Sequence, residues 1–238
     1  MSHTRFTVLV LFAIIAALSV TPANATLLGT VYIDNHTNGL SDQGTVWGGG
    51  LSGLTGYTGV YSWTNEGGTG AGIAVPNWGF CTELTQGTYD GWQDVVSLDA
   101  APVPPEYGTP MGMTKANYIR ELWGRDFDPS WITGQNRQMA EAFNACIWEI
   151  VYETDTDPVT GKVIWDVTSG SGFYATGIED WATANLWLSQ LDGTGPLANN
   201  LAATSSPYGQ DFIVQIPEPA TLSLLAFGAA ALLRRRKD

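Results

Sequence analysis

Cys81 and Cys146 are the only cysteines in this chain of 238 residues, and their thiols are its most reactive side chains. If oxidised together they would close a loop of about 65 residues, worth roughly 3–4 kcal/mol in the chain-entropy model. Cys146 also falls on an apolar helical stripe, which is typical of a free thiol that packs as a small hydrophobic side chain. The spacing therefore leaves two interpretations open, a Cys81–Cys146 disulfide or two buried thiols.

Other residue types offer less chemistry. Asp155 and Asp157, followed by Gly161, have the spacing of the start of a calcium loop but lack its closing glutamate, so a solvated turn is the more typical interpretation. His36 is the single histidine away from the N-terminus, which argues against zinc sites and Ser–His–Asp triads. No motif selects a carboxylate pair for glycoside hydrolysis. We therefore expect no enzyme, no metal and no cofactor.

Ten tryptophans raise the question of sugar stacking, since an exposed indole ring packs well on a carbohydrate face. Trp148 and Trp181 lie on or near expected helix faces and are predicted to be buried. Trp47, Trp63 and Trp92 lie in Gly-rich or polar surroundings and are the better candidates for exposure.

The elements that must position these residues follow from hydrophobic periodicity. Eleven glycines between positions 44 and 72 favour hairpins in the first half of the chain. An apolar face with helical spacing over 135–152 contains Cys146. Strands are expected at 27–33, 57–63, 78–84, 163–167 and 211–215, and helices at 114–123, 135–152 and 179–191. These elements predict one α+β domain over 26–215, with a β-rich first half, a helical insert and a closing strand.

The first 25 residues have the features of a secretory signal peptide. Arg5 provides the positive charge, residues 8–20 are apolar, and Ala23-Asn24-Ala25 is a small-x-small cleavage site. We expect signal peptidase to cut after Ala25, so that the chain folds outside the cytoplasm, where a disulfide can persist.

The last residues, 216–238, form a second targeting segment. Pro217-Glu218-Pro219 precedes an apolar run over 222–233, and Arg234-Arg235-Arg236 follows it. The apolar run predicts a short transmembrane helix with its basic end held in the cytoplasm. This order of features resembles the PEP-CTERM sorting domain of Gram-negative bacteria. The resemblance implies an exosortase substrate that is anchored transiently in the membrane and then released to the envelope or the exopolysaccharide matrix.

The charge balance excludes one class of partner. The whole chain has a formal charge of −13, and residues 26–219 carry about −17, because four of the basic residues belong to the C-terminal end. Nucleic-acid binding needs clustered Lys and Arg, which this acidic chain lacks.

Three sequence blocks in order resemble the signature blocks of bacterial Cys–Gln thioester domains: residues 80–83, 144–148 and 209–213. The resemblance implies that Cys81, which follows Phe80, is the thiol and that Gln210 is the acyl donor. It also implies supporting roles for Asn144 and Trp148 in the middle block.

The middle block departs from the family pattern. The family has Gln at the first position and Ala at the third, and this chain has Asn144 and Cys146 there. In such domains an amine or hydroxyl nucleophile opens the thioester and becomes attached through the glutamine, so the protein is consumed and is not an enzyme. The predicted function is a surface protein that attaches covalently, for example to surface amines. The alternative is a matrix protein that binds exopolysaccharide without covalent attachment and is held by a Cys81–Cys146 disulfide.

Overall fold

The computed structural model describes residues 27–37, 42–48, 50–65, 74–103 and 109–217. The predicted signal peptide, and the sorting segment after Pro217 with its expected transmembrane helix, lie outside the described residues. Within the described ranges, none of the helices has both the length and the apolar character required to span a membrane.

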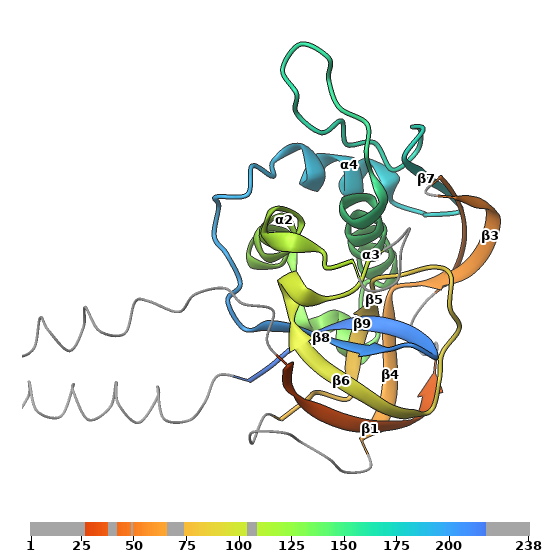
Figure 1. Ribbon diagram of the computed structural model, residues 1–238. Helices are drawn as coiled ribbons and strands as arrows, with labels where there is room; N and C mark the ends of the chain where they lie inside the picture. The colour runs from red at the N-terminus through yellow and green to blue at the C-terminus, as the bar shows by residue number, and fades with distance from the viewer. Residues whose placement is uncertain (1–26, 38–41, 49, 66–73, 104–108, 218–238) are drawn as a thin grey trace, which may run out of the picture.

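Six antiparallel strands close into a barrel in the order β1-β4-β5-β9-β8-β6. In Figure 1 the barrel forms the lower half of the molecule, with the helices above it. The strands are β1 (Leu27–Thr37), β4 (Val60–Asn65), β5 (Trp78–Cys81), β6 (Gly91–Ser97), β8 (Leu201–Ser206) and β9 (Gly209–Gln215).

Burial along the strands explains their places in the barrel. In β6, alternate residues are buried and exposed, so Val95 points inward while Trp92 is exposed. In β9 every residue but the last is buried. The strand has β5 and β8 as its two neighbours, and the burial of successive residues shows that both of its faces are covered. A strand buried on both faces needs apolar residues at most positions, and Phe212, Ile213 and Val214 provide them.

A smaller antiparallel sheet has the order β3-β2-β7, with β2 (Asp42–Gly48), β3 (Leu51–Thr58) and β7 (Phe173–Thr176). Val46, Phe173 and Ala175 are buried in the core, on the side of this sheet that meets α3. Most of β3 is exposed, and β3 forms one edge of the sheet. The sheet is drawn on the right of Figure 1.

The α-helices are α2 (Gly112–Asp126), α3 (Arg137–Tyr152) and α4 (Trp181–Ser189), with α2 and α3 on the barrel and α4 packed on these two helices. Short 3-10 helices occupy Leu98–Ala100 and Pro129–Thr133. Helix α3 is the central element, because every residue from 140 to 152 is buried, including the polar Glu141, Asn144 and Glu149. A helix buried on all sides must satisfy its polar side chains internally, which fixes α3 against its neighbours.

Most of the expected elements are confirmed, and the β-rich first half, the helical insert and the closing strand are observed. The closed barrel was not anticipated. The strand expected at 163–167 is wrong: Val163 makes a single isolated bridge to Thr156, residues 164–166 have no regular secondary structure, and a turn follows at 167–168.

The strand expected at 57–63 is divided in the structure between the end of β3 and the start of β4. Strands β6, β7 and β8 were not predicted, and β2 was expected only within unplaced hairpins. Strand β8 consists of Leu, Ala, Thr and Ser and carries little β propensity of its own.

Of the five tryptophans whose exposure was predicted, two are confirmed, two are wrong and one is partly buried. Trp148 is buried and Trp92 is exposed, as expected. Trp63 is buried in the barrel and Trp181 is half exposed at the start of α4, so both of these predictions are wrong. Trp47 is partly buried, because its ring stacks on Tyr174 of the neighbouring strand.

Candidate functional site

The pairing of β5 with β9 places the two predicted thioester residues on the same face. Cys81 lies opposite Phe212, and residues opposite one another in an antiparallel pair point to the same side. Gln210 is two residues before Phe212 and therefore shares that side. Tyr61 pairs with Gly79, two residues before Cys81, and so joins the same face from β4. Four side chains from three strands thus gather at one point.

One carbonyl oxygen connects the thiol with the amide. The Cys81 Sγ donates to the Glu83 carbonyl oxygen at 2.6 Å, and the Gln210 Nε2 donates to the same oxygen at 3.2 Å. The sulfur and the amide nitrogen can therefore be no further apart than these two distances together. The chain holds this oxygen in place because the Thr82 N–H donates to the Asp211 carbonyl, which continues the β5–β9 pairing by one residue.

Asn144 connects helix α3 to the strands that carry the site. Its Oδ1 accepts from the Gly59 N–H at 3.0 Å, and its Nδ2 donates to the Cys81 carbonyl oxygen at 3.0 Å. The side chain is fully buried, and an unpaired amide would be costly there. The predicted supporting role of Asn144 is thus positional: it fixes the backbone of Cys81 and the start of β4.

Two of the three aromatic side chains expected around the thiol lie beside it, and the third, Phe80, lies on the opposite face of the strand. Phe212 lies opposite Cys81 in the β5–β9 pairing, and Trp148 lies near the thiol; both side chains are buried. Phe80 is also buried, but it neighbours Cys81 in the strand and so points to the opposite face. There it packs on Trp123 and Phe143 in the helical layer. Phe80 therefore holds β5 against the helices and does not enclose the thiol.

Burial keeps the Cys81 thiol and the Tyr61 hydroxyl protonated. It raises the pKa of the Cys81 thiol well above its usual range, and the nearby Glu83 carboxylate raises it further. Burial also raises the pKa of Tyr61, so its hydroxyl stays protonated and donates to the Tyr57 carbonyl oxygen at 2.8 Å. The thiol proton must therefore be moved before the sulfur can act as a nucleophile.

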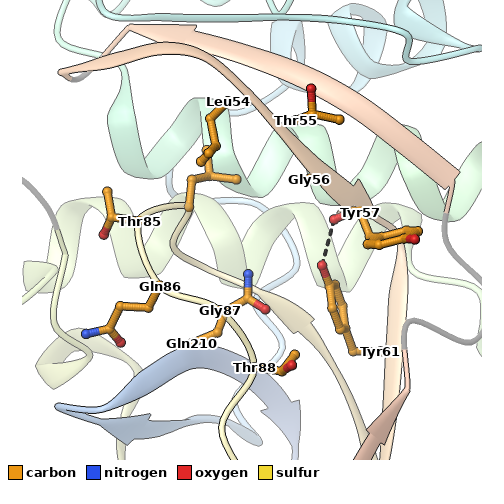
Figure 2. Close-up of a pocket in the computed structure, with 11 residues that line it drawn as sticks. Leu54, Thr55, Gly56, Tyr57, Tyr61, Thr85, Gln86, Gly87, Thr88 and Gln210 are labelled. Carbon is orange, nitrogen blue, oxygen red and sulfur yellow. Dashed lines mark hydrogen bonds between the residues drawn. The ribbon is translucent and has the colours of Figure 1, made fainter.

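A cavity of about 390 Å³ leads to this face. Figure 2 shows Gln210 rising from β9 into its centre, with Tyr61 beside it. Residues 54–57 of β3 form one wall and residues 84–88 form the other. The wall at residues 84–88 is hydrogen-bonded to β9, since the backbone N–H of Gln210 donates to the Gly87 carbonyl oxygen at 2.9 Å. Gln210 is 7% exposed and Cys81 is not exposed at all, so the amide borders the cavity while the thiol lies behind it.

The Cys81–Cys146 disulfide is absent from the structure, in which both residues are buried free thiols. The Cys146 Sγ donates to the Ala184 carbonyl oxygen of α4, whereas Cys81 contacts Glu83. Cys146 lies on the side of α3 that packs against α4, and this explains its place in the apolar stripe. The buried-thiol interpretation therefore describes Cys146.

The calcium candidates have structural partners. Asp155 accepts from the backbone and the hydroxyl of Ser171, and Asp157 accepts from the N–H groups of Val159 and Thr160. Within the described ranges, they do not gather with further metal-ligating side chains. The solvated-turn interpretation accounts for this segment.

Three parts of the site were missed from the sequence: Tyr61, Glu83 and the cavity. Glu83 follows Cys81 by two residues, and this spacing in a strand-like segment could have placed it beside the thiol. Tyr61 lies within the predicted strand at 57–63, but its pairing with β5 depends on the barrel topology, which no local pattern shows.

The comparisons with known proteins concern the C-terminus. Residues 215–237 match the family model described as the PEP-CTERM protein-sorting motif, which agrees with the predicted motif at Pro217-Glu218-Pro219 and the basic end. The chain is therefore an exported protein targeted to an exosortase, with an envelope or extracellular location. No curated protein and no solved structure gives a significant match.

Replacing Asn144 by Ala should destabilise the protein by about 2–4 kcal/mol, since the Gly59 N–H and the Cys81 carbonyl both lose a buried partner. Denaturant unfolding measures this change. The exposed Gln138 of the same helix is the control, and Gln138→Ala should stay within about 0.5 kcal/mol of wild type. Equal stabilities for the two variants would show that Asn144 does not hold the site.

Burial and the neighbouring Glu83 raise the pKa of Asp211 from 3.8 to about 7. The folded state therefore binds the proton more tightly than the unfolded state, and this contribution to stability is present below pH 4 and is lost as the pH rises through 7. Between pH 4 and pH 8, wild type should lose stability relative to Asp211→Asn by at most a few kcal/mol. Urea unfolding at a series of pH values measures the difference.

The control for this pH series is Asp192→Asn. Asp192 is exposed, and its pKa is lowered by hydrogen bonds from Thr194, so it titrates below this window. The Asp192 variant should follow wild type from pH 4 to pH 8. Parallel curves for wild type and Asp211→Asn would contradict the assignment of a raised pKa to Asp211.

Proposed function

We propose that this exported, exosortase-targeted protein attaches covalently to surface or matrix molecules through a thioester between Cys81 Sγ and the side-chain carbonyl carbon of Gln210. The observation that carries the proposal is the shared hydrogen-bond acceptor: the thiol and the amide both bond to the Glu83 carbonyl oxygen. Two reacting groups held this close need little further ordering to meet.

Formation of the thioester exchanges one leaving group for another. The Cys81 sulfur attacks the Gln210 carbonyl carbon, the S–C bond forms and the C–N bond breaks. The thiol proton passes to the departing nitrogen, which leaves as ammonia. We assign the transfer of this proton to the Glu83 carboxylate, because its charge lies close enough to the thiol to raise the pKa of Cys81.

The burial pattern suits a bond that must survive until a partner arrives. The sulfur lies behind the strands, against Phe212 and Trp148, where water has no access. The acyl side is at the floor of the cavity, where a nucleophile can reach the Gln210 carbonyl carbon (Figure 2). An incoming amine or hydroxyl then forms an amide or ester with Gln210, and the Cys81 thiol is regenerated. One chain makes one attachment, so the protein does not turn over.

A second candidate is polysaccharide binding without a covalent bond. Trp47 and Tyr174 stack with ring centroids 5.1 Å apart and an interplanar angle of 7°, on neighbouring strands of the small sheet. Trp92 is 58% exposed on the barrel. Flat, accessible rings can pack on sugar faces. This candidate no longer includes the disulfide, since both cysteines are free thiols.

Methylamine separates the two candidates. Incubation of the folded protein with methylamine should place one methylamide on Gln210, located by peptide mass mapping, because methylamine opens the thioester from the cavity. Cys81→Ala should abolish the labelling, since no acyl-sulfur bond can form.

The matched control is Cys146→Ala, which removes the other buried thiol and should leave the labelling intact. Absence of the methylamide in folded wild type, or its presence in Cys81→Ala, would overturn the thioester and leave polysaccharide binding as the better candidate.

A further inference from the structure

The outer edge of β3 is a second functional feature of the cavity. Strand β3 is an edge strand of the small sheet, and within the described ranges it pairs with β2 alone. Residues 54–57 of this edge form one wall of the cavity that contains Gln210. The cavity is therefore bounded on one side by strand backbone and not only by side chains.

The direction of the backbone groups on this edge follows from one hydrogen bond. The Tyr57 carbonyl oxygen accepts from the Tyr61 hydroxyl, so the backbone of Tyr57 points away from β2 and toward the cavity (Figure 2). Backbone groups two residues apart in a strand point to the same side. The N–H and C=O of Thr55 therefore also point into the cavity. The pairing with β2 is regular there, with Thr45 opposite Thr55 and their hydroxyls 3.3 Å apart.

A bulge interrupts this edge at Gly53, where the register with β2 shifts and φ is 67°, but residues 54–57 along the cavity pair with β2 in regular register. The sequence of β3, Leu51–Thr58, contains no charged residue and no proline, and six of its eight residues are glycine, serine, threonine or tyrosine. Exposed edges without such residues are templates for another strand. The opposite wall, at Gly87 and Thr88, is exposed loop, so the cavity is open to an extended chain.

The net negative charge of this protein favours extended segments that carry positive charge. Residues 26–219 carry about −17, so a segment that bears lysine is attracted to this protein over a long range. No charged residue is among those that line the cavity, so a peptide backbone meets no unpaired charge inside it. A volume of about 390 Å³ has the size of a short peptide segment rather than of a folded surface.

We propose that the outer edge of β3 binds an extended, lysine-bearing segment of a partner protein by strand addition, with its backbone paired to Thr55. The docking stands without the thioester, whereas capture of the segment rests on the proposed function. In the capture step the lysine amine attacks the Gln210 acyl carbon, a C–N bond forms, the C–S bond breaks, and a proton from the nitrogen goes to the Cys81 sulfur.

The test measures docking alone. Wild-type protein is first treated with methylamine, so that any acyl group is blocked, and is then titrated into a fluorescent, end-blocked peptide of sequence Thr-Val-Thr-Lys-Thr-Val-Thr. We expect saturable binding by fluorescence anisotropy. The same peptide with N-methyl groups at alternate backbone positions should bind at least about fivefold more weakly, because it cannot donate to the edge.

Protein variants provide the matched pair. Thr55→Pro removes the N–H that points into the cavity, and proline is tolerated where an edge N–H faces outward. Thr55→Val keeps that N–H and should bind as wild type, whereas Thr55→Pro should lose at least about fivefold in affinity.

Three results would overturn the proposal: no saturable binding up to millimolar peptide, equal binding of the N-methylated peptide to wild type, or displacement of the peptide by dextran at concentrations that saturate a sugar site. The N-methylated peptide keeps the test decisive even if Thr55→Pro fails to fold. Failure of docking with successful methylamine labelling would reject the edge site and leave the thioester intact.

Discussion

The side chain of Asn144 is the constraint on which the site depends, because it bonds two separate strands to the central helix. Its amide joins the Gly59 N–H at the start of β4 to the Cys81 carbonyl at the end of β5. Helix α3 is buried on all sides, so its position is fixed by the whole core. The Asn144 amide thereby fixes the backbone of Cys81 relative to α3, and the β5–β9 pairing fixes Gln210 relative to Cys81. The geometry of the site is therefore a consequence of the core.

The same arrangement separates a protected group from an accessible one. The thiol lies in an apolar, aromatic environment that raises its pKa, while the amide of Gln210 borders a cavity between β3 and residues 84–88. Close packing keeps these walls in place: a Cβ on Gly209 would lie 2.0 Å from the Cβ of Tyr89, so only glycine allows β9 to begin this close to that segment. A reactive bond needs both properties, since water must be excluded and one partner admitted.

The sequence predicted the helices, because these depend on local periodicity. The structure brings Cys81, Asn144 and Gln210 together, while their role in a thioester stays a prediction. The sequence did not predict the barrel, because closure depends on pairings between strands distant in the chain, such as β5 with β9. Trp63 was expected to be exposed and is buried, whereas Trp181 was expected to be buried and is half exposed, because contacts between distant segments and not local composition or helix position decide exposure. Tyr61 joined the site only through the barrel.

The most direct test of the thioester is the intact mass of the exported protein, purified without reductant. The proposed Cys81–Gln210 bond predicts a mass lower than the sequence mass by one ammonia, restored and increased to that of the methylamide on treatment with methylamine. A mass equal to that of the free thiols and the intact amide would contradict it. A loss of two hydrogens, reversed by reductant, would contradict both the thioester and the free thiols seen at Cys81 and Cys146.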